Sequence, residues 1–223
     1  MAESSLHPWN LSITEAAELQ RTLRGVVVEE DRLGPVRFVA GVDLSGVKSA
    51  GTVTAAAVLL TLPSLEPVEE SLVRGVLEFP YLPGFLSFRE APLMMEAVRG
   101  LSRQPDLLVV DGQGRAHPRG LGIACHLGLL LDIPAIGCAK SRLVGRHDDP
   151  APEAGSRTPL VYRGGTIGTV LRTKERVKPV FISVGHRVSL DTAVELALRC
   201  TRPGQRLPEP TRQAHLSAGR DSK

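Results

Sequence analysis

The sequence is poor in cysteine, and its three cysteines lack the spacing of a metal or redox motif. Cys125, Cys138 and Cys200 form no C-x-x-C pair, are odd in number and sit in apolar surroundings, which argues against a disulfide framework. The first ten residues also lack a basic region followed by an apolar one, the pattern of a secretory signal. We therefore expect a cytoplasmic protein with reduced cysteines in its core.

No uninterrupted hydrophobic run has the length of a membrane span. The longest mostly apolar stretch, residues 120–139, contains His126, Asp132 and Pro134 and is preceded by Arg119. These charges and the proline favour a buried helix followed by a buried strand. No membrane association is predicted.

Neither sign of charge dominates, and the chain has no internal repeat or low-complexity tract. The 223 residues carry a net charge of +3, with 42% hydrophobic and 23% charged residues, as in globular proteins. A sequence pI of about 9.0 permits a polyanionic partner without requiring one. We expect one domain over residues 1–223, ordered from about 12 to 218 with flexible termini, and a monomer.

Hydrophobic periodicity and capping signals predict an α/β protein in which a mixed sheet is flanked by helices. Capping-box patterns at Ser12–Glu15 and Ser87–Glu90 begin two of the helices. The predicted helices are about 13–27, 87–101, 121–131, 189–200 and 210–218, and the predicted strands are 37–45, 51–62, 70–79, 107–110, 135–140, a hairpin over 160–173 and 179–185. The first three strands should form an antiparallel meander, and the later strand–helix–strand units should be parallel right-handed crossovers. Residues 147–159 are expected to form a mobile loop.

Three carboxylates stand out from this pattern. Asp43 lies in the middle of an apolar strand, where a charge is costly unless it is paired or bound to metal. Glu90 lies in the first turn of a helix, and Asp111 ends a buried strand. Alone, Glu90 would be a capping glutamate and Asp111 a turn residue. If the strands of Asp43 and Asp111 are neighbours, however, all three carboxylates can converge.

Converging carboxylates repel one another and therefore imply a divalent cation. Hard oxygen ligands with open coordination positions favour Mg²⁺ or Mn²⁺. Such ions suit phosphodiester hydrolysis, because they activate a water molecule and stabilise the leaving oxygen.

Five segments resemble the endonuclease V family, the deoxyinosine 3′-endonucleases, in its bacterial form. They are VAGVDLSG (39–46), PYLPGFLSFRE (80–90), LLVVDGQGRAHPRGLGIACHLG (107–128), IPAIGCAKS (133–141) and ISVGHRVSLDTAVEL (182–196). The similarity runs from about residue 12 to 218. It implies an RNase H-like fold and Mg²⁺-dependent cleavage of DNA that contains a deaminated base, chiefly hypoxanthine, with Mn²⁺ able to substitute. The nick would fall at the second phosphodiester bond 3′ to the lesion.

The resemblance also implies roles for individual residues. The metal ligands would be Asp43, Glu90, Asp111 and His215. Lys140 and His117 would join the three acids as catalytic residues, on the phosphate or base side. The wedge loop and its DNA contacts would comprise Pro80, Tyr81, Leu82, Pro83 and Arg89. The base pocket would include Gly84, Leu86, Gly112 and Gly122.

Several alternatives stay open at this level. Tyr81 could be an ordinary loop-packing ring, Arg89 a surface charge and His215 a solvated residue of the tail. His126 and His186 are predicted to be structural. The substrate could be inosine-containing RNA rather than DNA, since the 2′-hydroxyl can be read or used. A non-catalytic nucleic-acid-binding module on the same scaffold is disfavoured, because clustered carboxylates would repel phosphate.

Overall fold

A computed structural model describes residues 6–45 and 52–220, and these residues form one eight-stranded sheet and five helices. The strands are β1 (Phe38–Leu44), β2 (Thr52–Thr61), β3 (Pro67–Val76), β4 (Leu107–Val110), β5 (Ala135–Ala139), β6 (Arg157–Tyr162), β7 (Gly165–Leu171) and β8 (Val180–His186). The helices are α1 (Ile13–Arg24), α2 (Leu86–Arg99), α3 (Ile123–Leu131), α4 (Leu190–Arg199) and α5 (Glu209–Arg220). Gly46 of the predicted motif, Gly51 of the predicted strand, and residues 1–5 and 221–223 of the predicted flexible ends lie outside the described residues.

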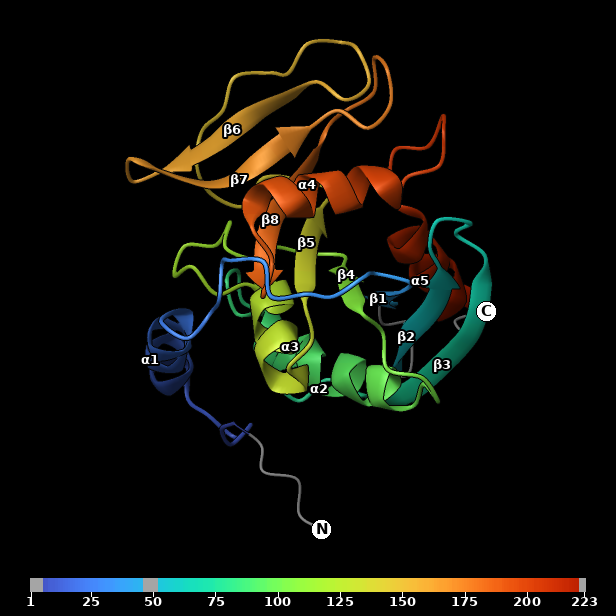
Figure 1. Cartoon of the computed structure of the whole chain (residues 1–223). Coiled ribbons are helices and arrows are strands. Elements are labelled where there is room, and N and C mark those ends of the chain that lie inside the picture. The colour runs from blue at the N-terminus through green and yellow to red at the C-terminus, as the bar shows by residue number, and fades with distance from the viewer. Residues whose placement is uncertain (1–5, 46–51, 221–223) are drawn as a thin grey trace.

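The sheet is mixed, as predicted, with the strand order β3-β2-β1-β4-β5-β8-β7-β6 (Figure 1). Strands β1, β2 and β3 form the antiparallel meander, and β4 and β5 are parallel to each other and to β1. The strand of Asp43 is therefore the neighbour of the strand that ends at Asp111, which confirms the adjacency on which the acidic cluster depends. Strand β8 runs antiparallel to β5. On its other side it pairs with β7, which forms the predicted hairpin with β6.

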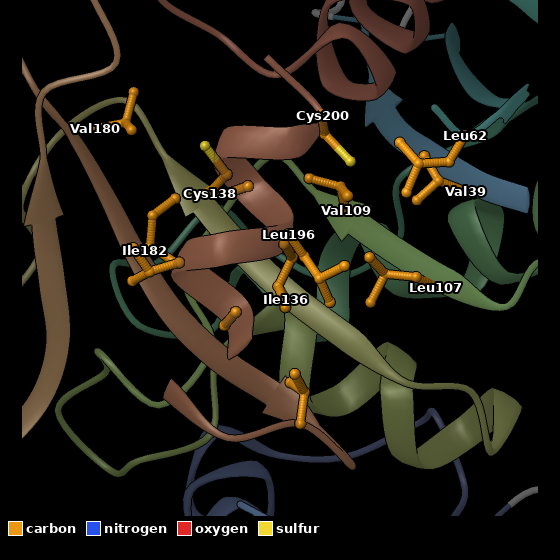
Figure 2. Packing of buried hydrophobic residues seen from close by; sticks show 14 of the residues in the cluster. Val39, Leu62, Leu107, Val109, Ile136, Cys138, Val180, Ile182, Leu196 and Cys200 are labelled. Carbon is orange, nitrogen blue, oxygen red and sulfur yellow. The ribbon is translucent and has the colours of Figure 1, made fainter. Parts of the chain in front are cut away.

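Helices cover both faces of the sheet, because its central strands are apolar on both sides (Figure 1). On one face, α4 and α5 pack against alternate residues of β4 such as Leu107 and Val109, as Figure 2 shows around Leu196 and Cys200. On the other face, α2 and α3 cover Leu108 and Val110 of β4 and Ala55 and Ala57 of β2. Helix α1 packs outside this layer, against α3 and the start of α2.

The structure corrects several local predictions. Helix α2 begins at Leu86 with Phe85 at its N-cap, and the Ser87 hydroxyl makes no hydrogen bond, so the predicted second capping box is wrong. Packing of Phe85 and Phe88 against α1 positions this helix end instead. Strand β3 begins at Pro67 rather than at residue 70, because the preceding turn closes early. The Thr61 amide donates to the Glu66 carbonyl at 3.0 Å, and pairing begins at once.

The predictions for Ser12, for the cysteines and for His126 are confirmed. Ser12 and Glu15 make the reciprocal bonds of a capping box at the start of α1. The three cysteines are free and buried, and His126 is fully buried. No helix in the described ranges is long and apolar enough to cross a membrane. The predicted loop over residues 147–159 is corrected, because residues 157–159 belong to strand β6 and the Arg172 guanidinium donates to the carbonyls of Pro150 and Ala151.

Candidate active site

Asp43 and Asp111 lie together at one end of the two central parallel strands. Val42 pairs with Val110, and the Asp111 amide donates to the Val42 carbonyl at 3.3 Å, so the two acids leave the sheet side by side. Asp43 is only 8% exposed. Burial and the charge of Asp111 raise the pKa of the Asp43 carboxyl above its usual range.

Glu90 comes to the same place from α2. Burial, followed by the charges of Asp43 and Asp111, raises the pKa of Glu90 to about 7. Because this shift responds to both aspartates, the three carboxylates form one electrostatic unit, as the sequence predicts. We call Asp43, Glu90 and Asp111 the acidic centre.

Two basic side chains contact the acidic centre. Lys140, just after β5, forms an ion pair with Asp111. His215, on α5, places its Nδ1 2.7 Å from an Asp43 carboxylate oxygen, and this contact lowers the Asp43 pKa against the stronger effect of burial. With these partners in place, no group of three or more His, Cys, Asp or Glu side chains among the described residues is arranged to hold one metal ion.

A cavity of about 360 Å³ opens beside the acidic centre. It brings together Asp111 and Lys140 with all four residues predicted for the base pocket. The predicted residues in its wall are Tyr81, Leu82, Pro83, Gly84, Leu86, Asp111, Gly112, His117, Gly122 and Lys140. The remaining residues of the wall, which the sequence reasoning missed, are Ser87, Gln113, Ile123, Ala139, Ser141, Arg142 and Leu143. Five of these lie inside the segments that resemble the family, and Arg142 directly follows one of them, which is the signal that could have found them.

Residues 81–84 of the segment Pro80–Gly84, which we call the wedge loop, form one side of this cavity. The Tyr81 side chain is strongly exposed, at 72%, so it is not the buried loop-packing ring of the alternative interpretation. Arg89 lies outside the cavity wall, and its guanidinium donates to the Phe79 carbonyl at 2.5 Å. Arg89 thereby ties α2 to the chain that leads into the wedge loop.

Main chain packs closely on main chain at Gly122, in the cavity wall, and at Gly114, which does not itself line the cavity; we call this contact the floor. A Cβ atom on Gly122 would lie 2.2 Å from the Gln113 carbonyl oxygen, and one on Gly114 would lie 2.0 Å from the Val184 carbonyl oxygen. Both distances are far shorter than any real contact, so only glycine allows these segments to approach. The loop after Asp111 is thereby pressed against α3 and β8.

His117 is committed to contacts within the protein. Its Nδ1 accepts from the Arg119 amide at 3.2 Å, so its Nε2 carries the proton and donates to the Gly84 carbonyl at 3.0 Å. Burial and the nearby Arg119 charge lower the pKa of His117 to about 4, which keeps the ring neutral. This geometry favours a role in shaping the cavity over proton transfer.

An acidic centre at the end of the central strands of a mixed sheet, beside an open cavity, is compatible with an enzyme that hydrolyses phosphodiester bonds. Comparison with known proteins supports this class. The sequence model of the endonuclease V family matches residues 21–216. Endonuclease V of Trichormus variabilis is 52% identical over 210 residues, which cover 93% of this chain and 94% of that protein. The chain therefore belongs to the endonuclease V family, whose members are nucleases with an RNase H-like fold.

Solved structures agree with this assignment. The crystal structure of endonuclease V from Streptomyces avermitilis is similar with a TM-score of 0.90 and 42% identity, covering 96% of this chain and 94% of that one. Endonuclease V from Ciona intestinalis, in complex with a 24mer DNA containing an inosine followed by a ribo-adenosine, is similar with a TM-score of 0.82 and 26% identity. That match covers 94% of this chain and 97% of the Ciona chain.

Proposed function

We propose that this protein is a repair endonuclease that recognises deaminated bases in DNA, chiefly deoxyinosine, and hydrolyses the second phosphodiester bond on the 3′ side. The observation that carries the proposal is that one cavity wall contains both the wedge loop and two residues at the acidic centre, Asp111 and Lys140. A base bound in this cavity would hold its own backbone near the carboxylates. Binding of the base would thus bring the phosphodiester bond close to the groups that cleave it.

The chemistry of the side chains in the acidic centre, though not their arrangement in this structure, suits a divalent cation. Asp43, Glu90 and Asp111 offer hard oxygen ligands, which Mg²⁺ and Mn²⁺ prefer, and His215 would complete the set. The raised pKa values of Asp43 and Glu90 show that burial and mutual repulsion disfavour their charged forms, and a cation relieves both effects. Bound there, the ion would supply Lewis acidity and a more acidic water molecule.

Side chains of this protein would perform the remaining steps. The Lys140 ammonium lies next to Asp111 and is available as a point charge for the scissile phosphate. The exposed ring of Tyr81 would stack in the space that an extruded base leaves behind. Main-chain groups around Gly84 and Gly122 would face the base itself.

The decisive experiment is a nicking assay on an end-labelled duplex with one deoxyinosine, with both product ends mapped. We expect a single nick one nucleotide beyond the lesion on its 3′ side with Mg²⁺ or Mn²⁺, and none with excess chelator. Asp111→Asn should abolish nicking while binding stays measurable. The matched control is Asp132→Asn, at the exposed end of α3, which should nick normally. Nicking of undamaged DNA at the same rate, or unimpaired nicking by Asp111→Asn, would contradict the proposal.

A second candidate substrate is inosine-containing RNA. The Ciona relative was crystallised with a strand in which a ribo-adenosine follows the inosine, so that protein accommodates a ribose next to the lesion. Matched oligonucleotides with deoxy- or ribonucleotides around one inosine separate the two substrates by the ratio of their kcat/KM values. We expect the DNA substrate to be preferred.

A further inference from the structure

The carbonyl of Gly84 accepts three hydrogen bonds from side chains that are distant in sequence. The donors are Gln20 Nε2 at 3.0 Å, His117 Nε2 at 3.0 Å and an Arg119 terminal nitrogen at 2.6 Å. A carbonyl oxygen has two lone pairs, so this number of donors exceeds what satisfying the group requires. The convergence indicates that this point of the cavity wall is fixed in place.

Gln20 is central to this network. It is the completely buried polar residue of α1, and its Nε2 also donates to the Leu121 carbonyl at 3.2 Å. Its Oε1 accepts a hydrogen bond from Arg119 Nε. This arrangement determines the amide orientation, because a flipped amide would point its oxygen at two carbonyls and its NH₂ at a guanidinium. Gln20 therefore joins α1, the wedge loop and the approach to α3.

Arg119 extends the same network to the start of α2. Its guanidinium lies 4.1 Å from the centre of the Phe85 ring, a cation–π distance, while it donates to Gly84. Gln20 holds this guanidinium through Arg119 Nε. The buried Gln20 amide, and Arg119 which it orients, thus hold the consecutive residues Gly84 and Phe85 in place.

We propose that Gln20 is a positioning residue for base recognition. It fixes Gly84 so that the cavity admits a lesion base in one pose, and this role rests on the inosine-directed nicking proposed above. Gln20 itself does not line the cavity, and none of its hydrogen bonds reaches the acidic centre. Its loss should therefore change substrate binding and discrimination and leave the chemical step intact.

The test uses Gln20→Met, which keeps the side-chain length and removes every hydrogen bond. We expect KM for the deoxyinosine duplex to rise about tenfold, the size expected when one or two buried hydrogen bonds are lost. The preference for deoxyinosine over deoxyadenosine should fall by a similar factor, while kcat changes less than about threefold. Amide hydrogen exchange across residues 80–88 should become faster in the free protein, because the wedge loop is no longer held.

The matched control is Leu23→Ala, on the same helix. Leu23 packs against Leu121 and Cys125 and makes no hydrogen bond to Gly84. The Leu23→Ala substitution therefore loosens α1 only by leaving a cavity. Each variant is assayed at the same interval below its own Tm. Equal KM, discrimination and exchange in the two variants, or a loss confined to kcat in Gln20→Met, would overturn the proposal. If the wild type fails to nick inosine, the proposed function fails, and the exchange data still decide whether Gln20 holds the loop.

Discussion

Gly41 couples the position of α5 to the acidic centre, so Gly41→Ala should impair both stability and nicking. A Cβ at this position of β1 would lie 1.9 Å from the Pro210 carbonyl oxygen and 2.1 Å from the carbonyl carbon. Ordinary contact begins at 3.4 Å, so the helix start must retreat by about 1.5 Å. The clashing atoms are backbone, which cannot rotate away.

The retreat of α5 should have effects of predictable size on both stability and nicking. Overpacking against rigid backbone costs about 3 kcal/mol, the upper part of the usual range. For a chain of this size that lowers Tm by roughly 6–12 °C. The same shift in α5 would stretch the 2.7 Å contact between His215 and Asp43 beyond hydrogen-bond length, so we expect nicking to fall at least about tenfold.

The assays are thermal unfolding and nicking of the deoxyinosine duplex, well below both melting temperatures. Gly34→Ala is the matched control, because a Cβ there meets no atom within 4 Å. A Gly41→Ala protein that melts like this control would refute the packing argument. One that melts lower but nicks normally would refute the link between α5 and the acidic centre.

Three further predictions concern other parts of the molecule. Burial and the nearby His7 lower the pKa of His126 to about 3. As the pH falls, His126 therefore takes up a proton at a higher pH in the unfolded chain than in the folded protein. The stabilisation present above about pH 6.5 is lost as the pH falls further. By denaturant titration, the wild type should lose about 2 kcal/mol more than His126→Gln between about pH 7 and 5, and parallel curves would contradict this. Tyr81→Ala should weaken binding to deoxyinosine DNA about tenfold in a filter-binding assay, with kcat nearly unchanged, since one stacked base is lost; unaltered affinity would count against the wedge. Lys140→Met should lower kcat about 100-fold with binding retained, because the ammonium that would interact with both Asp111 and the phosphate is lost. A normal single-turnover rate would exclude this role of Lys140.

The sequence predicts the centre of the fold well, because local signals and packing agree there. The four apolar residues before Asp111 can only be a strand buried on both faces, and this places Asp111 at the edge of the sheet. The start of α2 was predicted less well. Ser87 and Glu90 have the spacing of a capping box, but aromatic packing of Phe85 and Phe88 starts the helix earlier.

In the candidate site, too, some residues follow from local sequence signals and others only from the fold. Residues in contiguous motifs, such as Gly112 and Lys140, fall where the sequence places them, in one cavity wall. Gln20 could not be identified, because its importance arises from contacts with residues 64 and 101 positions away in the chain. Likewise, the protonation of His117 follows from its two partners in space, and no local pattern encodes it.

The main-chain floor under the cavity restricts how substrate preference can evolve or be engineered. At Gly122, a residue of the cavity wall, any side chain would collide with the Gln113 carbonyl oxygen, so this position cannot be used to deepen or narrow the space. Variation must instead come from the rim, at exposed positions such as Tyr81, Arg142 and Leu143. Libraries that aim at altered base preference should therefore diversify the rim and leave the floor unchanged.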